Sequence, residues 1–364
     1  MMNISYHLMV SAKTLTYPIY IGESLHDLFK DYFDKYPKIA LITNDTIFDL
    51  YRKFISNIEV RFPQVFHIAI KDGEKYKNIA TLNEVYQKLI SEDLGRDGLI
   101  IAFGGGVIGD LAGVASATYM RGIDFIQAPT TLLAMVDSSI GGKTAINLSK
   151  GKNIVGAFHQ PKAVLCDLIF LDTLPIRQFN SGLMEVIKYG LILDSSLYNY
   201  FIKNKENVKN HDKDTIAYLI YRCCQLKAKI VAEDEKEKGI RSILNFGHTV
   251  GHALESYTNY KFYLHGEAVA IGSLAIISYL VERGILNKNV LREFDDILSF
   301  FQLPTSIPAD FDIEQIIRHL SYDKKKRYGI NQWVTLKQIG VPAWEQLIDL
   351  KEVENILRGL KENG

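Results

Sequence analysis

The sequence predicts an α/β domain built on a mostly parallel sheet, followed by a mainly α-helical domain, with the active site in the cleft between them. Up to about Leu174-Pro175, apolar runs of strand length alternate with helical segments, which is typical of a parallel sheet with helices on both faces. Beyond that point helical periodicity dominates. A chain of 364 residues is long enough for two domains, and we expect these to span 1–177 and 178–364.

The first domain is expected to consist of strands separated by helices. Residues 25–36 have the pattern of an amphipathic helix, and a further helix is expected at about 79–93. Asn44 and Asp45 stand where a further helix would be capped, and the polar loop D-G-E-K-Y-K at 72–77 follows a predicted strand. Strands are expected at 4–10, 16–22, 38–43, 64–70, 98–103, 124–128 and 163–167.

The second domain is expected to be helical, with a single strand at 332–337. The basic run at 323–327 predicts a solvated face or a segment that folds back over the site. Predicted helices span 181–193, 212–235, 243–257, 266–284, 288–301 and 312–320. An exposed helix end is predicted from the alternating charges of Asp234, Glu235, Lys236, Glu237 and Lys238.

The composition argues against several functional classes. Forty-two basic and 42 acidic residues cancel, so a general binder of nucleic acids or membrane surfaces is not indicated. The three cysteines suggest no disulfide framework and fit a reducing compartment. The apolar run at 99–120 contains three consecutive glycines and an aspartate, which predicts a buried strand, loop and helix rather than a membrane span. The first residues lack the pattern of a signal peptide, and a cytoplasmic protein is expected.

A glycine loop, G-G-G-V-I-G-D at 104–110, follows one predicted strand and opens a helix. It satisfies G-x-G-x-x-G, in which glycines let the backbone approach a pyrophosphate at a helix N-terminus. The next strand ends in Pro129-Thr130-Thr131, whose hydroxyls would reach the same crevice of a Rossmann-like sheet. By itself the motif is also compatible with a tight turn between strand and helix.

A second cluster of glycine, lysine and asparagine spans 137–153. Ammonium and amide donors of this kind converge on phosphate oxygens, which favours a phosphorylated substrate. An ordinary solvated loop is the alternative, and it suits Lys150. It suits Lys143 less well, because that lysine lies between Gly142 and an apolar stretch.

Three histidines, His248, His252 and His265, each stand beside a glycine. The first two are four residues apart and would share a helix face, while a returning helix would bring the third back to them. Glu185 lies on a mostly apolar predicted helix, and a buried carboxylate needs a partner. Together with His248 and His265 it would leave one coordination position open, as catalytic zinc sites do. The alternatives are a surface histidine pair and an ion pair between Glu185 and Lys188.

Seven motifs match one family, in that family's order and across most of the chain. They are G-G-G-V-I-G-D at 104–110, R-G-I-D-F at 121–125, P-T-T-L-L-A-M-V-D-S-S-I-G-G-K at 129–143, G-K-N-I-V-G-A-F-H-Q-P at 151–161, M-E-V-I-K-Y-G at 184–190, L-N-F-G-H-T-V-G-H-A-L-E at 244–255 and H-G-E-A-V-A-I-G at 265–272. The chain resembles the 3-dehydroquinate synthases, the shikimate-pathway branch of the sugar phosphate cyclases.

This resemblance implies an NAD-dependent lyase that also uses zinc or cobalt. The implied reaction converts 3-deoxy-D-arabino-heptulosonate 7-phosphate to 3-dehydroquinate and phosphate. Its implied steps are transient oxidation of a hydroxyl, elimination of phosphate, reduction, ring opening and an intramolecular aldol closure, with no net redox change. The leaving phosphate is expected to act as the base. The resemblance also implies a homodimer in which Arg121 is lent across the interface.

The resemblance assigns the site residues motif by motif. The implied metal ligands are Glu185, His248 and His265. The implied NAD site consists of Asn44, Asp72, Glu74, Lys77, Gly105, Gly106, Val107, Asp110, Thr130, Thr131, Lys143, Lys152 and Thr173. The implied substrate site consists of Arg121, Asp137, Lys143, Asn153, Lys188, Lys227, Arg241, Asn245, His252 and Lys325, with Lys324 as the alternative to Lys325.

Three other functions fit parts of this pattern. A cyclase that makes 2-deoxy-scyllo-inosose or a valiolone resembles the layout but differs around I-G-G-K and the substrate lysines. A metal-dependent alcohol or glycerol dehydrogenase of similar plan would release NADH stoichiometrically. A non-catalytic protein that keeps the fold would have no need of a buried cation site with these neighbours.

Overall fold

The structure is a computed structural model that describes residues 2–149, 151–326, 333–345 and 348–361. The chain forms two compact units, one of Met1–Leu174 with Ile216–Lys236 and one of Pro175–Thr215 with Glu237–Gly364. Most of the long helix α8 (Lys213–Glu233) therefore belongs to the first unit, although the chain has already begun the second.

A seven-stranded sheet forms the centre of the first unit, in the order β1-β2-β9-β6-β5-β3-β4. β1 and β2 pair antiparallel and the other neighbours pair parallel, which confirms the mostly parallel, Rossmann-like sheet. The strands are β1 (Asn3–Ser11), β2 (Thr16–Glu23), β3 (Ile39–Asn44), β4 (Val65–Ile70), β5 (Leu99–Gly104), β6 (Asp124–Pro129) and β9 (Val164–Asp167). The flanking helices are α1 (Phe29–Phe33), α2 (Asp45–Arg61), α3 (Ile79–Ser91) and α4 (Gly106–Thr118).

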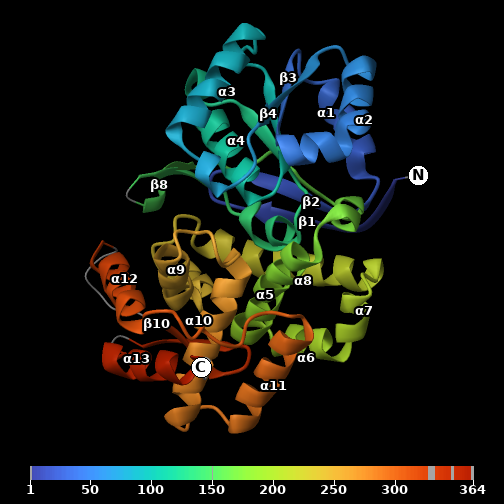
Figure 1. Ribbon diagram of the computed structural model, residues 1–364. Helices are drawn as coiled ribbons and strands as arrows, with labels where there is room; N and C mark the ends of the chain where they lie inside the picture. Colours follow the sequence, from blue (N-terminus) through green and yellow to red (C-terminus); the bar gives the residue numbers. More distant parts are fainter. Residues whose placement is uncertain (1, 150, 327–332, 346–347, 362–364) are drawn as a thin grey trace. The chain divides into compact units, whose positions relative to one another are not determined.

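Alternate side chains along the central strands enter two separate cores. In β3, Ile39 and Leu41 lie in one core, which also includes Ile55 of α2. Ala40 and Ile42 lie in the other core, which is completed by apolar residues of α3 and α4. Figure 1 shows these helices on the two faces of the sheet, so the unit has three layers.

An antiparallel hairpin that was not predicted overlaps the cluster at 137–153 and extends beyond it. It consists of β7 (Lys143–Leu148) and β8 (Gly151–Phe158). Its glycines resemble those of a loop, but one of them is needed for strand pairing, because a Cβ at Gly156 would lie 2.0 Å from the carbonyl oxygen of Thr144. The predicted helix at 25–36 is shorter than expected and begins as a 3₁₀ turn, η1 (Leu25–Leu28).

The second unit is mainly helical, as predicted. Its helices are α5 (Ile176–Leu193), α6 (Ser195–Lys203), α7 (Lys205–Lys209), η6 (Ile240–Asn245), α9 (His248–Tyr257), α10 (His265–Glu282), α11 (Lys288–Phe300), α12 (Ile313–Lys326) and α13 (Leu350–Gly359). The single helix predicted at 243–257 is wrong, because Gly247 takes a left-handed φ of +75° and separates η6 from α9. The prediction of one strand is also wrong, since β10 (Trp333–Gln338) pairs with β11 (Val341–Glu345).

Glu235 is buried, which corrects the prediction that it lies on an exposed helix end. The helix α8 ends two residues earlier, and the chain then turns inward. The carboxylate of Glu235 accepts hydrogen bonds from Thr14 N at 3.2 Å, from the Thr14 hydroxyl and from Gln160 Nε2 at 2.9 Å. It therefore joins three segments of the first unit that are far apart in sequence.

Replacing Glu235 with Gln is expected to lower the free energy of unfolding by about 1–2 kcal/mol at pH 7, because charge-assisted hydrogen bonds become neutral ones. Burial alone would raise the pKa of Glu235, but the hydrogen bonds from Thr14 and Gln160 outweigh it and hold this pKa below its ordinary value. The carboxylate therefore stabilises the fold above its unfolded-state pKa of about 4.3, and the stabilisation is lost as the pH falls through the folded-state pKa. Urea unfolding of both proteins from pH 7 downward checks this. A difference that does not shrink in acid would contradict the assignment.

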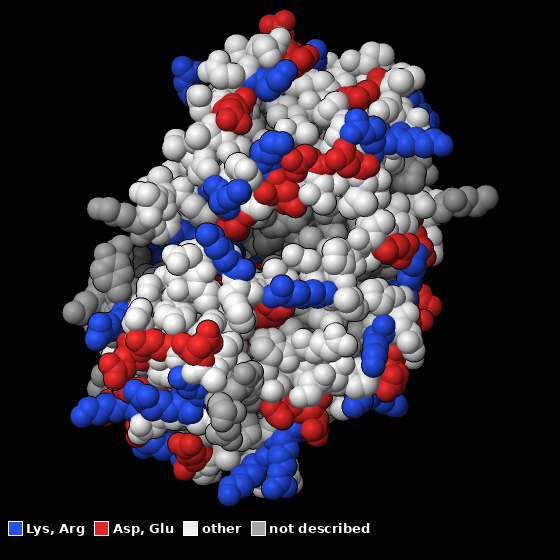
Figure 2. Space-filling model, in the orientation of Figure 1, with Lys and Arg blue, Asp and Glu red and all other residues white. Residues whose placement is uncertain are grey.

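On the face drawn in Figure 2, basic and acidic side chains are interspersed, and neither sign forms a continuous field. The three cysteines, Cys166, Cys223 and Cys224, are buried thiols. Among the described residues, none of the helices combines the length and the apolar character needed to cross a membrane.

Candidate active site

Most residues predicted to bind NAD follow the carboxyl ends of four neighbouring parallel strands, β4, β3, β5 and β6. Asn44 ends β3 and caps α2 by accepting a hydrogen bond from Ile47 N at 2.8 Å. Its amide donates to Asp72 Oδ1, beyond β4, at 2.7 Å. Asp72 also accepts from the Thr46 hydroxyl at 2.9 Å. These contacts form one polar network at the edge where open parallel sheets bind their ligands.

The glycine loop between β5 and α4 brings backbone donors to the same edge. Gly105 is the N-cap of α4, and Gly106 and Val107 begin its first turn, where N–H groups have no partner within the helix. A Cβ at Gly105 would lie 3.0 Å from Thr131 Cγ2, which leaves little room for a side chain. The hydroxyl of Thr130, after β6, is buried and has no hydrogen-bond partner among the described residues. The loop is thus suited to a pyrophosphate.

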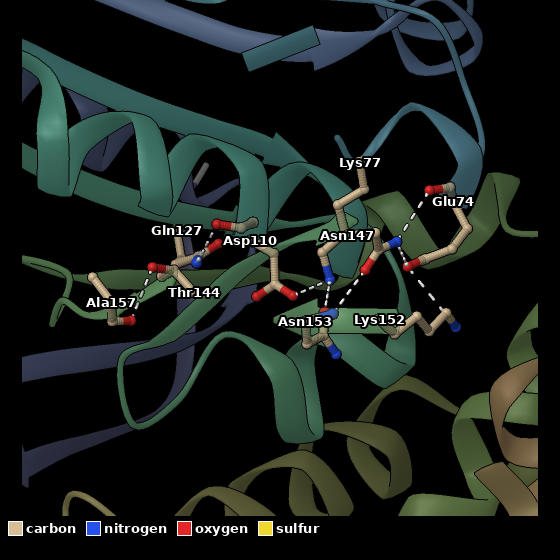
Figure 3. Close-up of polar contacts among 10 residues, drawn as sticks. Glu74, Lys77, Asp110, Gln127, Thr144, Asn147, Lys152, Asn153 and Ala157 are labelled. Carbon is tan, nitrogen blue, oxygen red and sulfur yellow. Dashed lines mark hydrogen bonds and ion pairs between the residues drawn. The ribbon is translucent and has the colours of Figure 1, made fainter. Parts of the chain in front are cut away.

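Lys77 is a buried lysine that joins three segments (Figure 3). Its ammonium pairs with the carboxylate of Asp110 in α4 and donates to Asn153 Oδ1 in β8 at 2.6 Å. Burial raises the pKa of Asp110, and the nearby Lys77 ammonium opposes that rise. Gly73, with a φ of +112°, provides the turn that lets the loop place Lys77 there. The predicted residues Lys77, Asp110 and Asn153 are therefore brought together.

Two further predicted residues of the first unit form an ion pair. Lys227, a buried residue of α8, donates to Asp137 Oδ1 and to the Asp137 carbonyl oxygen, both at 2.7 Å. Asp137 lies in a short π-helix, η4 (Ala134–Ser138). Such irregular turns are frequent at functional sites. Lys143 is exposed at the start of β7.

The predicted metal ligands lie together in the second unit, on three different helices. Glu185 of α5 is fully buried, and its Oε1 lies 3.7 Å from His248 Nε2 of α9 and 3.6 Å from His265 Nε2 of α10. These separations exceed a hydrogen bond but are close to the distance of about 3.4 Å between two atoms bound to one tetrahedral ion with bonds of about 2.1 Å. The other oxygen, Oε2, pairs with Lys188. The intrahelical ion pair and the ligand cluster therefore both exist.

Both histidines direct Nε2 toward Glu185 because their other ring nitrogen faces an acceptor. His248 Nδ1 donates to the carbonyl oxygen of Phe246 at 2.9 Å, which leaves Nε2 with a free lone pair. His265 Nδ1 lies 3.6 Å from Glu255 Oε2.

Burial lowers the pKa of His248 well below its ordinary value. Burial also acts to lower the pKa of His265, but the carboxylates of Glu185 and Glu255 raise it to about 10. The cluster therefore favours a bound cation.

Glycines allow the three helices to approach closely enough for this cluster to form. A Cβ at Gly266, beside His265, would lie 1.9 Å from the carbonyl oxygen of Ser181 in α5. A Cβ at Gly272 would lie 2.0 Å from the carbonyl oxygen of Gly247, beside His248. A larger residue at either position would therefore force these backbones apart.

The remaining predicted residues occupy varied environments. Arg241 is buried in η6, and Asn245, at the end of η6, donates to Glu237 Oε1 at 3.2 Å. His252 is half-buried one turn beyond His248. Arg121 is exposed, and the Thr173 hydroxyl contacts Tyr51 at 2.6 Å. The last turn of α12 contains Lys324 and Lys325, but their side chains lie outside what the structure describes.

Two charged pairs at the histidines were not predicted: Glu255 with His265, and Arg177 with Glu267. Glu255 lies seven residues after His248 and three after His252, so helical spacing would have placed it on their face of α9. Arg177 in the first turn of α5 makes a bidentate ion pair with Glu267, with N–O distances of 2.6 and 2.8 Å. Glu267 also accepts from Leu264 N at the start of α10, so this pair ties together the helices that carry Glu185 and His265. Ninety residues separate its partners, and no local pattern would have shown it.

Replacing Glu255 with Gln is expected to weaken binding of Zn²⁺ or Co²⁺ by about 10–100-fold, because the carboxylate orients His265. Equilibrium dialysis against a competing chelator measures the dissociation constant directly. Glu282→Gln, at the exposed end of α10, removes the same charge away from the cluster and should leave the constant unchanged. Equal affinity in wild type and Glu255→Gln would contradict this role.

Comparison with known proteins identifies the family. The models of the 3-dehydroquinate synthase N-terminal and C-terminal regions match residues 67–181 and 182–326. The chain is 44% identical to 3-dehydroquinate synthase of Shewanella loihica and 41% identical to that of a Shewanella species, each over 89% of this chain and 91% of the relative. A solved 2-deoxy-scyllo-inosose synthase complexed with carbaglucose-6-phosphate, NAD⁺ and Co²⁺ is 26% identical, with a TM-score of 0.85 over 97% of this chain and 99% of the other. The chain belongs to the 3-dehydroquinate synthase family.

Proposed function

We propose that this chain converts 3-deoxy-D-arabino-heptulosonate 7-phosphate to 3-dehydroquinate and phosphate, with NAD and a divalent metal ion. The observation that carries the proposal is the grouping of buried Glu185 and His248 with half-buried His265, in a chain whose family has this activity. The cyclase relative at 26% identity contains NAD⁺, Co²⁺ and a sugar phosphate analogue, which supports the same ligand classes here.

The first unit fits NAD. The first turn of α4, with Gly105, Gly106 and Val107, would hold the pyrophosphate, and the buried hydroxyl of Thr130 has an unused hydrogen-bonding capacity beside it. The other proposed contacts are those of the predicted NAD site: Asn44, Asp72, Glu74, Lys77, Asp110, Thr131, Lys143, Lys152 and Thr173. NAD held there would supply a hydride acceptor for a substrate hydroxyl and a hydride for the later reduction, with no net redox change.

The second unit fits a small divalent ion. Two imidazoles with their Nε2 atoms toward one buried carboxylate form a three-ligand set that leaves a position for substrate, as catalytic zinc sites do. Zn²⁺ or Co²⁺ bound there supplies a Lewis acid for a substrate oxygen.

The chain's own residues are proposed to bind and orient the substrate. In the first unit, Asp137 holds the Lys227 ammonium at 2.7 Å, and Lys143 and Asn153 add donors for phosphate or hydroxyl oxygens. In the second unit the proposed substrate contacts are Lys188, Arg241, Asn245, His252 and Lys325. Their main task is to hold one reactive conformer, because ring opening and closure need orientation more than a strong base. The leaving phosphate is proposed to take the proton during elimination.

We also propose a cytoplasmic homodimer in which Arg121 reaches the partner's substrate. Arg121 is exposed and has a left-handed φ of +69°, and its neighbour Met120 is an exposed apolar residue. An exposed cation held in a strained turn beside apolar surface suits a contact between subunits.

Phosphate release from the heptulosonate phosphate tests the proposed function. Release that requires NAD, stops with EDTA, resumes with Zn²⁺ or Co²⁺ and leaves no lasting NADH absorbance is expected. Accumulation of NADH without phosphate would instead indicate a dehydrogenase. Turnover of glucose 6-phosphate or sedoheptulose 7-phosphate, with none of the heptulosonate phosphate, would indicate another cyclase.

A further inference from the structure

Asn147, at the centre of the contacts in Figure 3, connects two parts of the first unit through one side-chain amide. Its Nδ2 donates to Glu74 Oε1 at 2.7 Å, in the loop that follows β4. Its Oδ1 accepts from Asn153 N at 2.9 Å, in the hairpin strand β8. The amide therefore uses its donor and its acceptor on two different segments of the proposed site.

Both partners of Asn147 lead directly to other residues of that site. Glu74 Oε1, the atom that Asn147 contacts, also lies 3.8 Å from Lys152 Nζ. Asn153 holds a left-handed φ of +53° and accepts from the buried Lys77 at 2.6 Å. A shift of the hairpin relative to the loop would therefore move Lys152 away from Glu74, and Asn153 away from Lys77.

We propose that Asn147 is a positioning residue, which sets the geometry of the NAD site by fixing the loop at Glu74 to the β7–β8 hairpin. The inference rests on the proposed use of NAD and adds a residue that the family resemblance does not assign. Asn147 would not touch the cofactor. It would act through Glu74, Lys152 and Asn153, which are themselves proposed contacts.

The need for asparagine at this position follows from hydrogen-bond chemistry. A carboxylate in its place would still accept from Asn153 N, but its second oxygen would face the Glu74 carboxylate at about the separation of a hydrogen bond, with no proton between them. The backbone would stay in register, because Asn147 N donates to the Lys77 carbonyl oxygen at 2.8 Å whatever its side chain. The substitution N147D therefore disturbs the connection without removing the strand pairing.

Exchanging the hydrogen-bond donor and acceptor between positions 147 and 74 tests whether Asn147 acts by positioning Glu74 or by contacting NAD itself. In N147D, NAD binding measured by calorimetry is expected to weaken by about tenfold, since two carboxylates then oppose each other. E74Q alone changes a proposed NAD contact, so its own affinity serves as the reference for the double variant; its glutamine amide still offers an oxygen to Asn147. The double variant N147D/E74Q restores a donor and an acceptor in reversed order, and it should bind within about threefold of E74Q. N83D changes an exposed asparagine on α3 and is the matched control; it should bind NAD as tightly as wild type does.

Each outcome decides a point. A double variant that binds as weakly as N147D, or more weakly, overturns the inference while leaving the proposed function intact. A wild-type protein that does not bind NAD overturns both. If N147D does not fold, N147A takes its place. NAD binding that is weaker by about fivefold in N147A, and that does not recover when E74Q is added, supports the positioning role. Wild-type affinity for NAD in N147A contradicts it.

Discussion

His265→Ala is expected to abolish stoichiometric metal binding and activity while the protein stays folded. The imidazole lies between the carboxylates of Glu185 and Glu255, with its Nε2 and Nδ1 each 3.6 Å from one of them. Loss of one ligand of three should cost about 3 kcal/mol of metal affinity, or more than about hundredfold in the dissociation constant. Metal content after dialysis, measured by atomic absorption, gives the stoichiometry, and circular dichroism reports the fold.

His252→Ala is the matched control for this experiment. His252 stands on the same helix as His248, but it does not belong to the ligand group formed with Glu185. The His252→Ala protein should keep one equivalent of metal, although its activity is expected to fall because His252 is a proposed substrate contact. Full metal content in His265→Ala, or loss of metal in His252→Ala, would show that the ligand assignment is wrong.

Lys77→Met is expected to lower the free energy of unfolding by about 3 kcal/mol, because it leaves the Asp110 carboxylate without its cation. The lysine side chain is 5% exposed and that of Asp110 is 19% exposed, so water compensates only in part. Asp110 already has a raised pKa, and loss of Lys77 should raise it further. A carboxyl group whose pKa is higher in the folded than in the unfolded protein destabilises the fold at neutral pH, and this penalty disappears as the group becomes protonated at low pH. The deficit of Lys77→Met should therefore shrink as the pH falls, which urea unfolding at several pH values would show.

Two comparisons make this prediction specific. Lys75→Met removes an exposed lysine from the same loop and should change stability by less than about 0.5 kcal/mol. The double variant Lys77→Met/Asp110→Leu removes both charges and should be more stable than Lys77→Met alone, because an unpaired buried charge costs more than a missing pair. A double variant that is less stable would mean that Lys77 acts mainly through Asn153.

The fold and the cofactor side of the site could be predicted because the relevant patterns are local. Apolar runs of strand length alternate with helices, and the glycine loop and Thr130 follow neighbouring parallel strands, whose carboxyl ends must meet at one edge. The hairpin β7–β8 was missed because its glycines, such as Gly156, resemble those of a loop although they permit strand pairing.

On the metal side, the expected burial of Glu185 already suggested a site with His248 and His265. A surface histidine pair and an ion pair with Lys188 stayed open as alternatives, and the family resemblance favoured the metal site. Spacing alone pairs His248 with His252, whereas the structure groups His248 with Glu185 and His265, which lie on other helices. Two polar residues that connect distant segments were not predicted to do so. Asn147 is separated from Glu74 by 73 residues, and Glu235 from Thr14 by 221. No periodicity or motif connects such pairs, because tertiary packing alone brings them together.

The close helix contacts at Gly266 and Gly272 have a consequence for which ions the protein accepts. Where backbones touch, the main chain limits how far the helices that carry the ligand atoms can move relative to one another. Ions that form bonds of about 2.0–2.2 Å to nitrogen and oxygen suit such a scaffold, whereas Ca²⁺, with bonds of about 2.3–2.6 Å and six to eight oxygen ligands, does not. We therefore expect helix packing to favour the smaller ions, and enlarging either glycine to relax this preference even where every ligand is retained.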